Sequence, residues 1–234
     1  MNAKQFCILT VIYITVISAI LTITNFTSAV TTAVVQNSPL NRDYTLIIDP
    51  GHGGEDGGAT SVSGILESKY NLEISLRLRD IFHLLGYRTE MTRTTDQSIY
   101  TRGSTIAEKK VSDLKERVRI VNEKESAILI SIHQNFFADE RYSGAQVFYA
   151  ESAESEALAI MLQSAFRSTL NQGSRRNAKE ADGIYLMEHI NCTGILVECG
   201  FLSNHAEETA LRAKEYQLKI CCVIASTVGT FLTK

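Results

Sequence analysis

The sequence contains no tract rich in Lys or Arg. Its 23 Lys and Arg residues and 26 Asp and Glu residues give a formal net charge of −3 over 234 residues. Proteins that hold nucleic acid by charge carry a basic patch or stripe, and the phosphate contacts of that patch supply most of the affinity. We therefore expect no nucleic-acid partner.

A cysteine framework is also missing. The five cysteines are an odd number without regular spacing, whereas disulfide-stapled domains carry an even number at regular intervals. We expect these side chains to be small buried apolar groups. They are Cys7, Cys192, Cys199, Cys221 and Cys222.

Short motifs that mark common metal and phosphate sites are absent too. No HExxH sequence occurs, which excludes the helical zinc-protease motif. The glycine-rich loop 49–58 (DPGHGGEDGG) lacks the lysine of GxxxxGK[ST], and its Glu55 and Asp56 would repel a phosphate. A calcium loop would need more oxygen ligands at short spacing.

Charge is nearly absent from the N-terminal segment, where Lys4 is the only charged residue before Arg42. The stretch Phe6–Thr24 is uncharged and mostly apolar, which is typical of a secretory signal peptide or of an uncleaved membrane anchor. Both interpretations stay open, and both place the rest of the chain outside the cytoplasm. The chain is thus predicted to comprise a signal or membrane anchor segment at 1–29, a spacer at 30–43 and one globular domain at 44–234.

Apolar runs of strand length alternate with helical patterns from Thr45 onward. Two runs, AILISI at 127–132 and GILV at 194–197, are apolar without alternation, which is typical of strands covered on both faces. We therefore predict an α/β fold with three layers, in which a mixed, mostly parallel twisted sheet is flanked by helices on both faces. The predicted strands are 45–49, 87–93, 127–132, 144–149, 184–187 and 194–197, the predicted helices are 67–85, 114–123, 154–170 and 204 or 205 to 231, and 94–110 is predicted to be a long loop.

Polar, chemically capable side chains follow three of the predicted strands. Asp49 ends the first strand and His52 comes soon after it, His133 follows AILISI, and Glu198 follows GILV. Ligands of α/β sheets bind at the carboxyl ends of the strands. Glu67 begins the next helix on the same side as its apolar stripe, so we expect its carboxylate to face the core beside this edge.

Each of these residues alone has an ordinary explanation. A histidine after a strand is most often a loop residue, a glutamate in the first turn of a helix suits the helix dipole, and a glutamate after a strand commonly points to solvent. Four such groups that converge on one edge of a sheet favour a functional site.

Two histidines and a carboxylate are a suitable ligand set for catalytic zinc, which keeps three protein ligands and one open position. The arrangement that fits is His52, Glu67 and His133 as metal ligands, with Glu198 as the general base. A cysteine hydrolase that uses Cys199 with His133 is the alternative from the residues alone. Cys199 follows Glu198 on a strand, so we expect its side chain on the opposite face of the sheet.

Four motifs in chain order carry a resemblance to a known family: DPGHGGEDGGA, GILESKYNL, ISIHQN and ILVECGFLSN. They are similar to those of the zinc-dependent N-acetylmuramoyl-L-alanine amidases of bacterial cell walls, the amidase-3 family, over residues 45–231. The resemblance implies a zinc ion held by His52, Glu67 and His133 and a catalytic carboxylate at Glu198. It also implies that 44–234 is a catalytic domain that hydrolyses the amide between the muramic acid lactyl group and L-alanine of the stem peptide.

A single catalytic domain behind an apolar N-terminal segment, without wall-binding repeats, most resembles the spore-cortex subfamily. Those amidases remove stem peptides so that muramic δ-lactam can form, in the sporulation and germination pathway. The resemblance implies peptidoglycan as substrate, an extracytoplasmic location and contact with the membrane if the N-terminal segment is uncleaved, and it leaves an accessory extracytoplasmic protein open. Three alternatives also stay open: a zinc peptidase that cuts within the stem peptide, a vegetative cell-wall autolysin, and a wall-binding module without catalysis.

Overall fold

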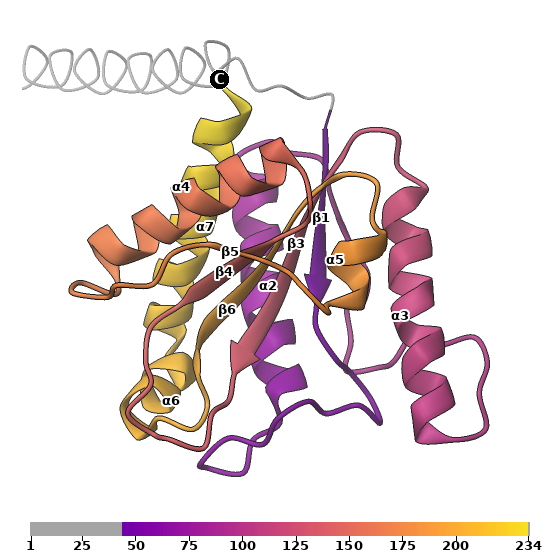
Figure 1. The fold of residues 1–234 in the computed structure, drawn as a ribbon, viewed down its shortest axis with the longest axis horizontal. Coiled ribbons are helices and arrows are strands. Elements are labelled where there is room, and N and C mark those ends of the chain that lie inside the picture. The colour runs from indigo at the N-terminus through magenta and orange to yellow at the C-terminus, as the bar shows by residue number, and fades with distance from the viewer. Residues whose placement is uncertain (1–43, 234) are drawn as a thin grey trace, which may run out of the picture. The chain divides into compact units, whose positions relative to one another are not determined.

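The structure is a computed structural model that describes residues 44–233 (Figure 1). The predicted signal or anchor segment at 1–29 and the spacer at 30–43 lie outside the described residues, as does Cys7. Among residues 44–233, no helix combines the length and the apolar character that a membrane crossing requires.

A six-stranded sheet forms the centre of the described domain. Its spatial order is β2-β1-β3-β6-β4-β5, and its neighbouring strands are parallel except for the pair β4 and β6. The prediction of a mixed, mostly parallel sheet is therefore confirmed. The strands are β1 (Thr45–Pro50), β2 (Thr89–Met91), β3 (Ala127–Asn135), β4 (Gln146–Tyr149), β5 (Lys179–Glu180) and β6 (Thr193–Phe201).

Helices cover both faces of the sheet, which confirms the three-layer prediction (Figure 1). On one face, Ile47, Leu129 and Leu196 of the central strands pack with residues of α3 and α5. The alternate residues Ile48 and Ile130 are fully buried on the other face, where α7 contacts both α2 and α4. The helices are α2 (Glu67–Leu84), α3 (Ile106–Asn122), α4 (Ala153–Thr169), α5 (Tyr185–His189), α6 (His205–Arg212) and α7 (Lys214–Leu232).

Helix α3 begins eight residues before the predicted start at 114, so it takes up part of the predicted loop 94–110. A capping box explains this start, because the Thr105 side chain accepts the Glu108 N–H while the Glu108 side chain accepts the Thr105 N–H. The two residues form the T-x-x-E pattern that marks a helix N-terminus. The sequence therefore contains a local signal for this start, and the apolar periodicity alone does not show it.

Two other predicted elements differ from the structure. The prediction of a strand at 184–187 is wrong, since these residues lie in or next to α5, where the rings of Tyr185 and His189 stack one helical turn apart with centroids 3.9 Å apart. Periodicity alone cannot assign so short an apolar run to a strand or a helix. The single helix predicted from 204 to 231 is two helices, because Ala213 takes an extended conformation (ψ 124°) between α6 and α7.

The four cysteines of the described domain are free thiols. Cys199 and Cys221 are buried, as predicted, and Cys192 is half-buried. The prediction is wrong for Cys222, which is exposed because successive residues of a helix point about 100° apart, so that it falls outside the buried side of α7 that holds Cys221.

Candidate functional site

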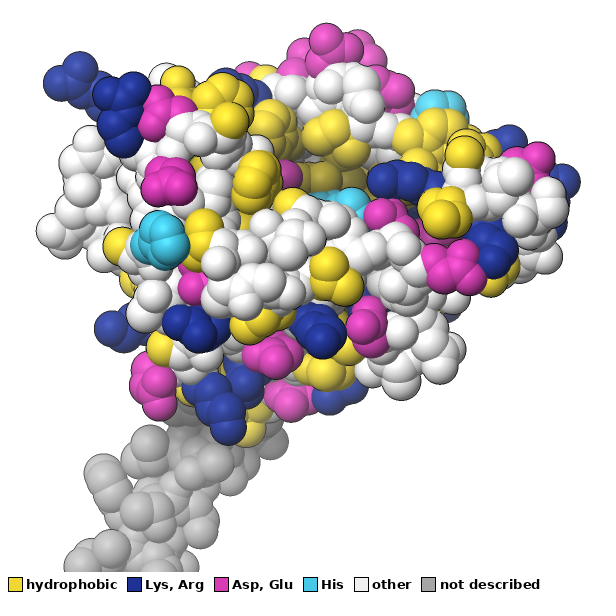
Figure 2. Space-filling view, turned by 90° about the horizontal axis from the view of Figure 1, so that it is seen from below, with side chains coloured by type: hydrophobic (Ala, Val, Ile, Leu, Met, Phe, Trp, Pro, Cys, Tyr) yellow, Lys and Arg dark blue, Asp and Glu magenta, His cyan; other side chains and the backbone are white. Residues whose placement is uncertain are grey.

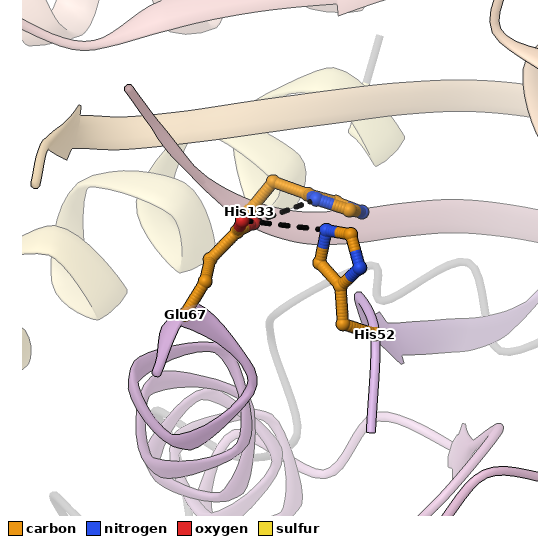
Figure 3. A group of neighbouring side chains, drawn as sticks. All are labelled: His52, Glu67 and His133. Carbon is orange, nitrogen blue, oxygen red and sulfur yellow. Dashed lines mark hydrogen bonds and ion pairs between the residues drawn. The ribbon is translucent and has the colours of Figure 1, made fainter. Parts of the chain in front are cut away.

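The carboxyl ends of β1, β3 and β6 meet at one edge of the sheet and bring the four predicted site residues together. His52 follows β1 by two residues, and Glu67 is the first residue of α2. His133 and Glu198 are register partners on the parallel neighbours β3 and β6. Figure 3 shows both histidine rings directed at the carboxylate of Glu67.

The donor atoms of three of these residues converge on a small volume. His52 Nε2 lies 3.3 Å from Glu67 Oε2, and His133 Nδ1 lies 3.0 Å from Glu67 Oε1. One ligand atom from each residue lies within 4.8 Å of the other two, and the two imidazole centroids are 4.9 Å apart. Within residues 44–233, this is the one such group of His, Cys, Asp or Glu side chains that can hold a metal ion.

Glu67 is held as a buried anion, with a relative exposure of 4%. Its Oε2 accepts the Ala59 N–H at 3.0 Å, and its Oε1 accepts the Gln134 N–H and Asn71 Nδ2, each at 3.2 Å. Burial alone would raise the pKa of this carboxyl, but the hydrogen bonds to the two histidines hold its pKa well below the usual range. A buried carboxylate between two imidazoles offers a negative charge to a bound cation.

His52 takes a left-handed backbone conformation with a φ of 60°, the one positive φ of a non-glycine residue in the described part of the chain. This conformation costs roughly 1–3 kcal/mol, so the surrounding structure must hold it in place. The ring Nδ1 lies 2.9 Å from Asp56 Oδ2, which leaves Nε2 directed at Glu67. Burial disfavours the charged ring, but Asp56 and Glu67 outweigh it and raise the pKa of His52 to about 9.

Two buried arginines that the sequence analysis did not single out hold the backbone around His52. Arg93 donates to the carbonyls of Pro50 and Gly51 at 2.9 and 3.0 Å. Arg117 donates to the carbonyls of Pro50 and His52 at 2.9 and 2.8 Å. These bonds satisfy the carbonyls of a tight loop and stabilise the strained conformation of His52.

Asp49 supports these arginines and is not part of the donor set. Its Oδ1 lies 2.5 Å from Arg117 Nη1 and accepts Thr92 Oγ1 at 2.6 Å, while its Oδ2 accepts Ser131 Oγ at 2.8 Å. Burial would raise the pKa of Asp49, but Arg117 and the two hydroxyls lower it below the usual value. The sequence signal for this pair is an arginine four residues before Val121, on the buried stripe of α3.

Two glycines of the DPGHGGEDGG loop are required by close approach of the site residues. A Cβ on Gly51 would lie 2.1 Å from His133 Nε2. A Cβ on Gly58, which has a φ of 68°, would lie 2.6 Å from Glu67 Oε2. The glycine-rich loop therefore packs its bare backbone directly against the histidine and the carboxylate.

Glu198 is the second carboxylate of the site and differs from Glu67 in its hydrogen bonding. Its Oε2 is buried and has no hydrogen-bond partner within the described residues. Burial raises the pKa of Glu198 to about 7, and Glu67 adds to the rise while His133 and His52 oppose it. A buried polar atom without a partner is rare in folded proteins, and a carboxyl with a pKa near neutrality can both accept and donate a proton.

Cys199 does not take part in this site. It is 1% exposed, and its Sγ contacts the carbonyl of Val197 at 3.7 Å. Burial raises the pKa of its thiol well above the usual value, which disfavours a reactive thiolate. The cysteine-hydrolase alternative therefore lacks an accessible nucleophile.

The site opens onto the face of the domain at the carboxyl ends of the strands. Figure 2 looks onto this face and shows a hollow with a histidine side chain at its floor and hydrophobic, acidic and basic side chains around it. Phe136 and Phe137, which follow β3 directly, are 50% and 51% exposed. An external substrate can therefore reach this edge of the sheet.

Comparison with known proteins agrees with this geometry. Residues 46–229 match the N-acetylmuramoyl-L-alanine amidase family, amidase-3. The chain is 38% identical over 191 residues to the germination-specific N-acetylmuramoyl-L-alanine amidase of Bacillus subtilis (strain 168), which covers 81% of this chain and 80% of that protein.

Solved structures show the same fold. The CwlD amidase from Clostridioides difficile, solved in complex with the GerS lipoprotein, is similar with a TM-score of 0.77 and 34% identity over 80% of this chain and 98% of that one. An N-acetylmuramoyl-L-alanine amidase from Clostridium difficile 630 has a TM-score of 0.70 and 28% identity over 82% of this chain and 98% of that one. With the family match over nearly all of the described domain, these similarities show that the chain is a cell-wall amidase of the amidase-3 family, the N-acetylmuramoyl-L-alanine amidases.

Proposed function

We propose that this amidase hydrolyses the amide between the lactyl group of N-acetylmuramic acid and L-alanine of the stem peptide with a zinc ion held by His52, Glu67 and His133. Glu198 is the general base and acid of the reaction. The observation that carries the proposal is the convergence of three donor atoms within 4.8 Å of one another beside a carboxyl whose pKa is about 7.

The donor set fits zinc. Two imidazole nitrogens and one carboxylate are the three protein ligands typical of catalytic zinc, and a fourth position stays free for water or substrate. The hydrogen bond of His52 Nδ1 to Asp56 is the kind of support that orients metal-binding histidines. A zinc ion bound here supplies a Lewis acid that makes water more acidic and polarises the amide carbonyl.

Glu198 moves the protons. As a carboxylate it accepts a proton from the attacking water, and as a carboxylic acid it donates that proton to the leaving amine of alanine. Without a metal ion, burial raises the pKa of Glu198 to about 7, and a bound cation would favour its carboxylate, the form that accepts the proton of the water. The buried Oε2 is free to take part because no described residue occupies it.

The similar proteins support a setting in the spore cortex. The curated relative is named as germination-specific, and the CwlD structure contains a lipoprotein partner. We propose that this chain acts outside the cytoplasm on cortex peptidoglycan, on the pathway to muramic δ-lactam, and that an accessory protein binds it. Residues 44–234 are the catalytic domain, and segment 1–29 directs them across the membrane as a cleaved signal or anchors them to it.

Mass spectrometry of digested peptidoglycan tests the reaction. The zinc-loaded protein should release peptides that begin with a free L-alanine amine, and a chelator should stop the release until zinc is restored. New termini within the stem peptide would identify a peptidase instead. Binding to the wall without any released peptide would identify a module without catalysis.

A further inference from the structure

A basic groove of about 920 Å³ lies at the end of β4 that faces the site edge of the sheet. This volume is in the range of small-ligand sites and accommodates a short peptide. Four cationic side chains and a single carboxylate line the groove. They are Arg141, Arg175, Arg176, Lys179 and Glu207.

The positive charge of this basic groove is not balanced from within. Glu207 accepts the backbone N–H groups of Gly144 at 2.7 Å and Phe201 at 2.8 Å and supplies one negative charge beside Arg176. Arg141 is paired with Asp139 at 2.7 Å. Arg175 and Lys179 are exposed and form no ion pair with any residue of the described domain. A concave surface with excess charge of one sign attracts ligands of the opposite sign.

Arg176 is held in a fixed position inside the groove. Its Nε donates to the carbonyl of Ser143 at 3.0 Å, and its guanidinium lies 4.8 Å from the centroid of the Phe201 ring. A stacked guanidinium is planar and pre-organised for a carboxylate, which it can bind through two parallel N–H groups.

The basic groove lies next to the site, one strand away from Glu198. Gln146, which lines the groove, is the register partner of Glu198 across β4 and β6. Tyr142 stacks on Phe201 with centroids 6.2 Å apart and contacts Phe137 edge-on at 4.7 Å. These three rings form a row from the end of β3, the strand of His133, to the groove.

We propose that the basic groove binds the carboxylates of the stem peptide while the amide to be cleaved lies at Glu198. This inference rests on the proposed function. Residues beyond the first alanine of a stem peptide carry free carboxylates unless they are amidated. Three or four extended residues span about 10–14 Å, and neighbouring strands are about 4.8 Å apart, so a peptide that crosses β6 and β4 reaches the groove. The groove thus makes the enzyme selective for acidic stem peptides.

Charge reversal of the two unpaired cations tests this assignment. The zinc-loaded full chain is compared with Arg175→Glu/Lys179→Glu on a muramoyl tetrapeptide with free carboxylates and on its fully amidated counterpart. The reversal should lower kcat/KM on the carboxylate substrate about tenfold, mainly through KM, which corresponds to about 1.4 kcal/mol. On the amidated substrate it should have no effect. Lys115→Glu/Lys219→Glu, the same charge change at exposed positions outside the basic groove, should change neither.

The two substrates separate failure of the groove from failure of the proposed function. An equal loss of kcat/KM on both substrates would overturn the groove assignment. No loss of kcat/KM on either substrate would also overturn it and would favour a protein partner as the ligand of the groove. If the unaltered enzyme releases no alanine-terminated peptide from either substrate, the proposed function fails instead. Calorimetric binding of the free tetrapeptide then decides on the groove alone: weaker binding after charge reversal supports it, and unchanged binding refutes it.

Discussion

Replacing Glu198 with glutamine removes a carboxyl whose ionised form the fold disfavours. Burial raises the pKa of Glu198 from 4.5 to about 7. The unfolded chain loses this proton near pH 4.5 and the folded chain only near pH 7, so the folded state binds more protons in between. The stability of the metal-free protein therefore falls as pH rises through this window, by at most about 3 kcal/mol at 1.36 kcal/mol per pKa unit.

The variant Glu198→Gln lacks this component. The unfolding free energy of the variant minus that of the unaltered protein should therefore rise by up to about 3 kcal/mol as the pH is raised from 4 to 8. Its activity should fall about 10²–10⁴-fold, because a positioned acid–base group contributes that much to the rate. Its metal content should stay the same, since Glu198 is not one of the three converging donors.

Urea unfolding of the chelator-treated proteins at several pH values measures the first effect, and peptide release together with elemental analysis measures the others. Glu125→Gln, at an exposed position remote from the donor set, serves as the matched control and should show none of them. A stability difference that does not vary with pH would refute the burial argument. Turnover within tenfold of the unaltered enzyme would refute the role of Glu198 as general base.

Three other substitutions follow from the contacts of the site. Glu67→Ala should abolish zinc binding in elemental analysis, whereas Glu55→Ala, which removes a half-exposed carboxylate paired with a surface lysine, should retain the metal. Asp56→Asn weakens the support of the first histidine ligand and should lower zinc affinity about 10–100-fold in a chelator competition, and unchanged affinity would mean that the ring is oriented without it. Asp49→Asn removes a negative charge beside the buried guanidinium of Arg117 and should lower the unfolding free energy by about 3–5 kcal/mol in denaturant unfolding at neutral pH. Because the fold lowers the pKa of Asp49, this cost should shrink as pH falls through and below 3.8, and a cost independent of pH would contradict the ion pair.

The sheet was predictable because its strands carry strong local signals. β3 and β6 contain apolar runs without alternation, and only burial on both faces makes such runs stable in water. At 184–187 the apolar run was too short for its pattern to distinguish a strand from a helix. In the structure these residues belong to α5 or precede it, and Leu186 and Met187 stabilise the helix by packing with residues of α3. The two-residue strand β5 has no local signal and depends on its parallel pairing with β4.

The grouping of the site residues was predictable for a related reason. Parallel strands place their carboxyl ends at one edge, so residues that follow different strands must lie near one another. His133 and Glu198 follow this rule directly, as register partners on adjacent strands. Their metal-binding and catalytic roles remain predictions, which the substitutions above test.

The sequence by itself determined the α/β class, the edge where the chemistry lies and the four side chains that meet there, because all of these follow from periodicity and from motif order. The tertiary structure alone decided what holds them. Arg117 reaches Asp49 across 68 residues, and Arg93 reaches the carbonyl of Gly51 across 42. Each of these bonds joins one buried side chain to one group far away in the sequence, so it leaves no periodic pattern in the sequence. Only the folded chain therefore reveals the strained His52, the arginines that support it and the basic groove beside it.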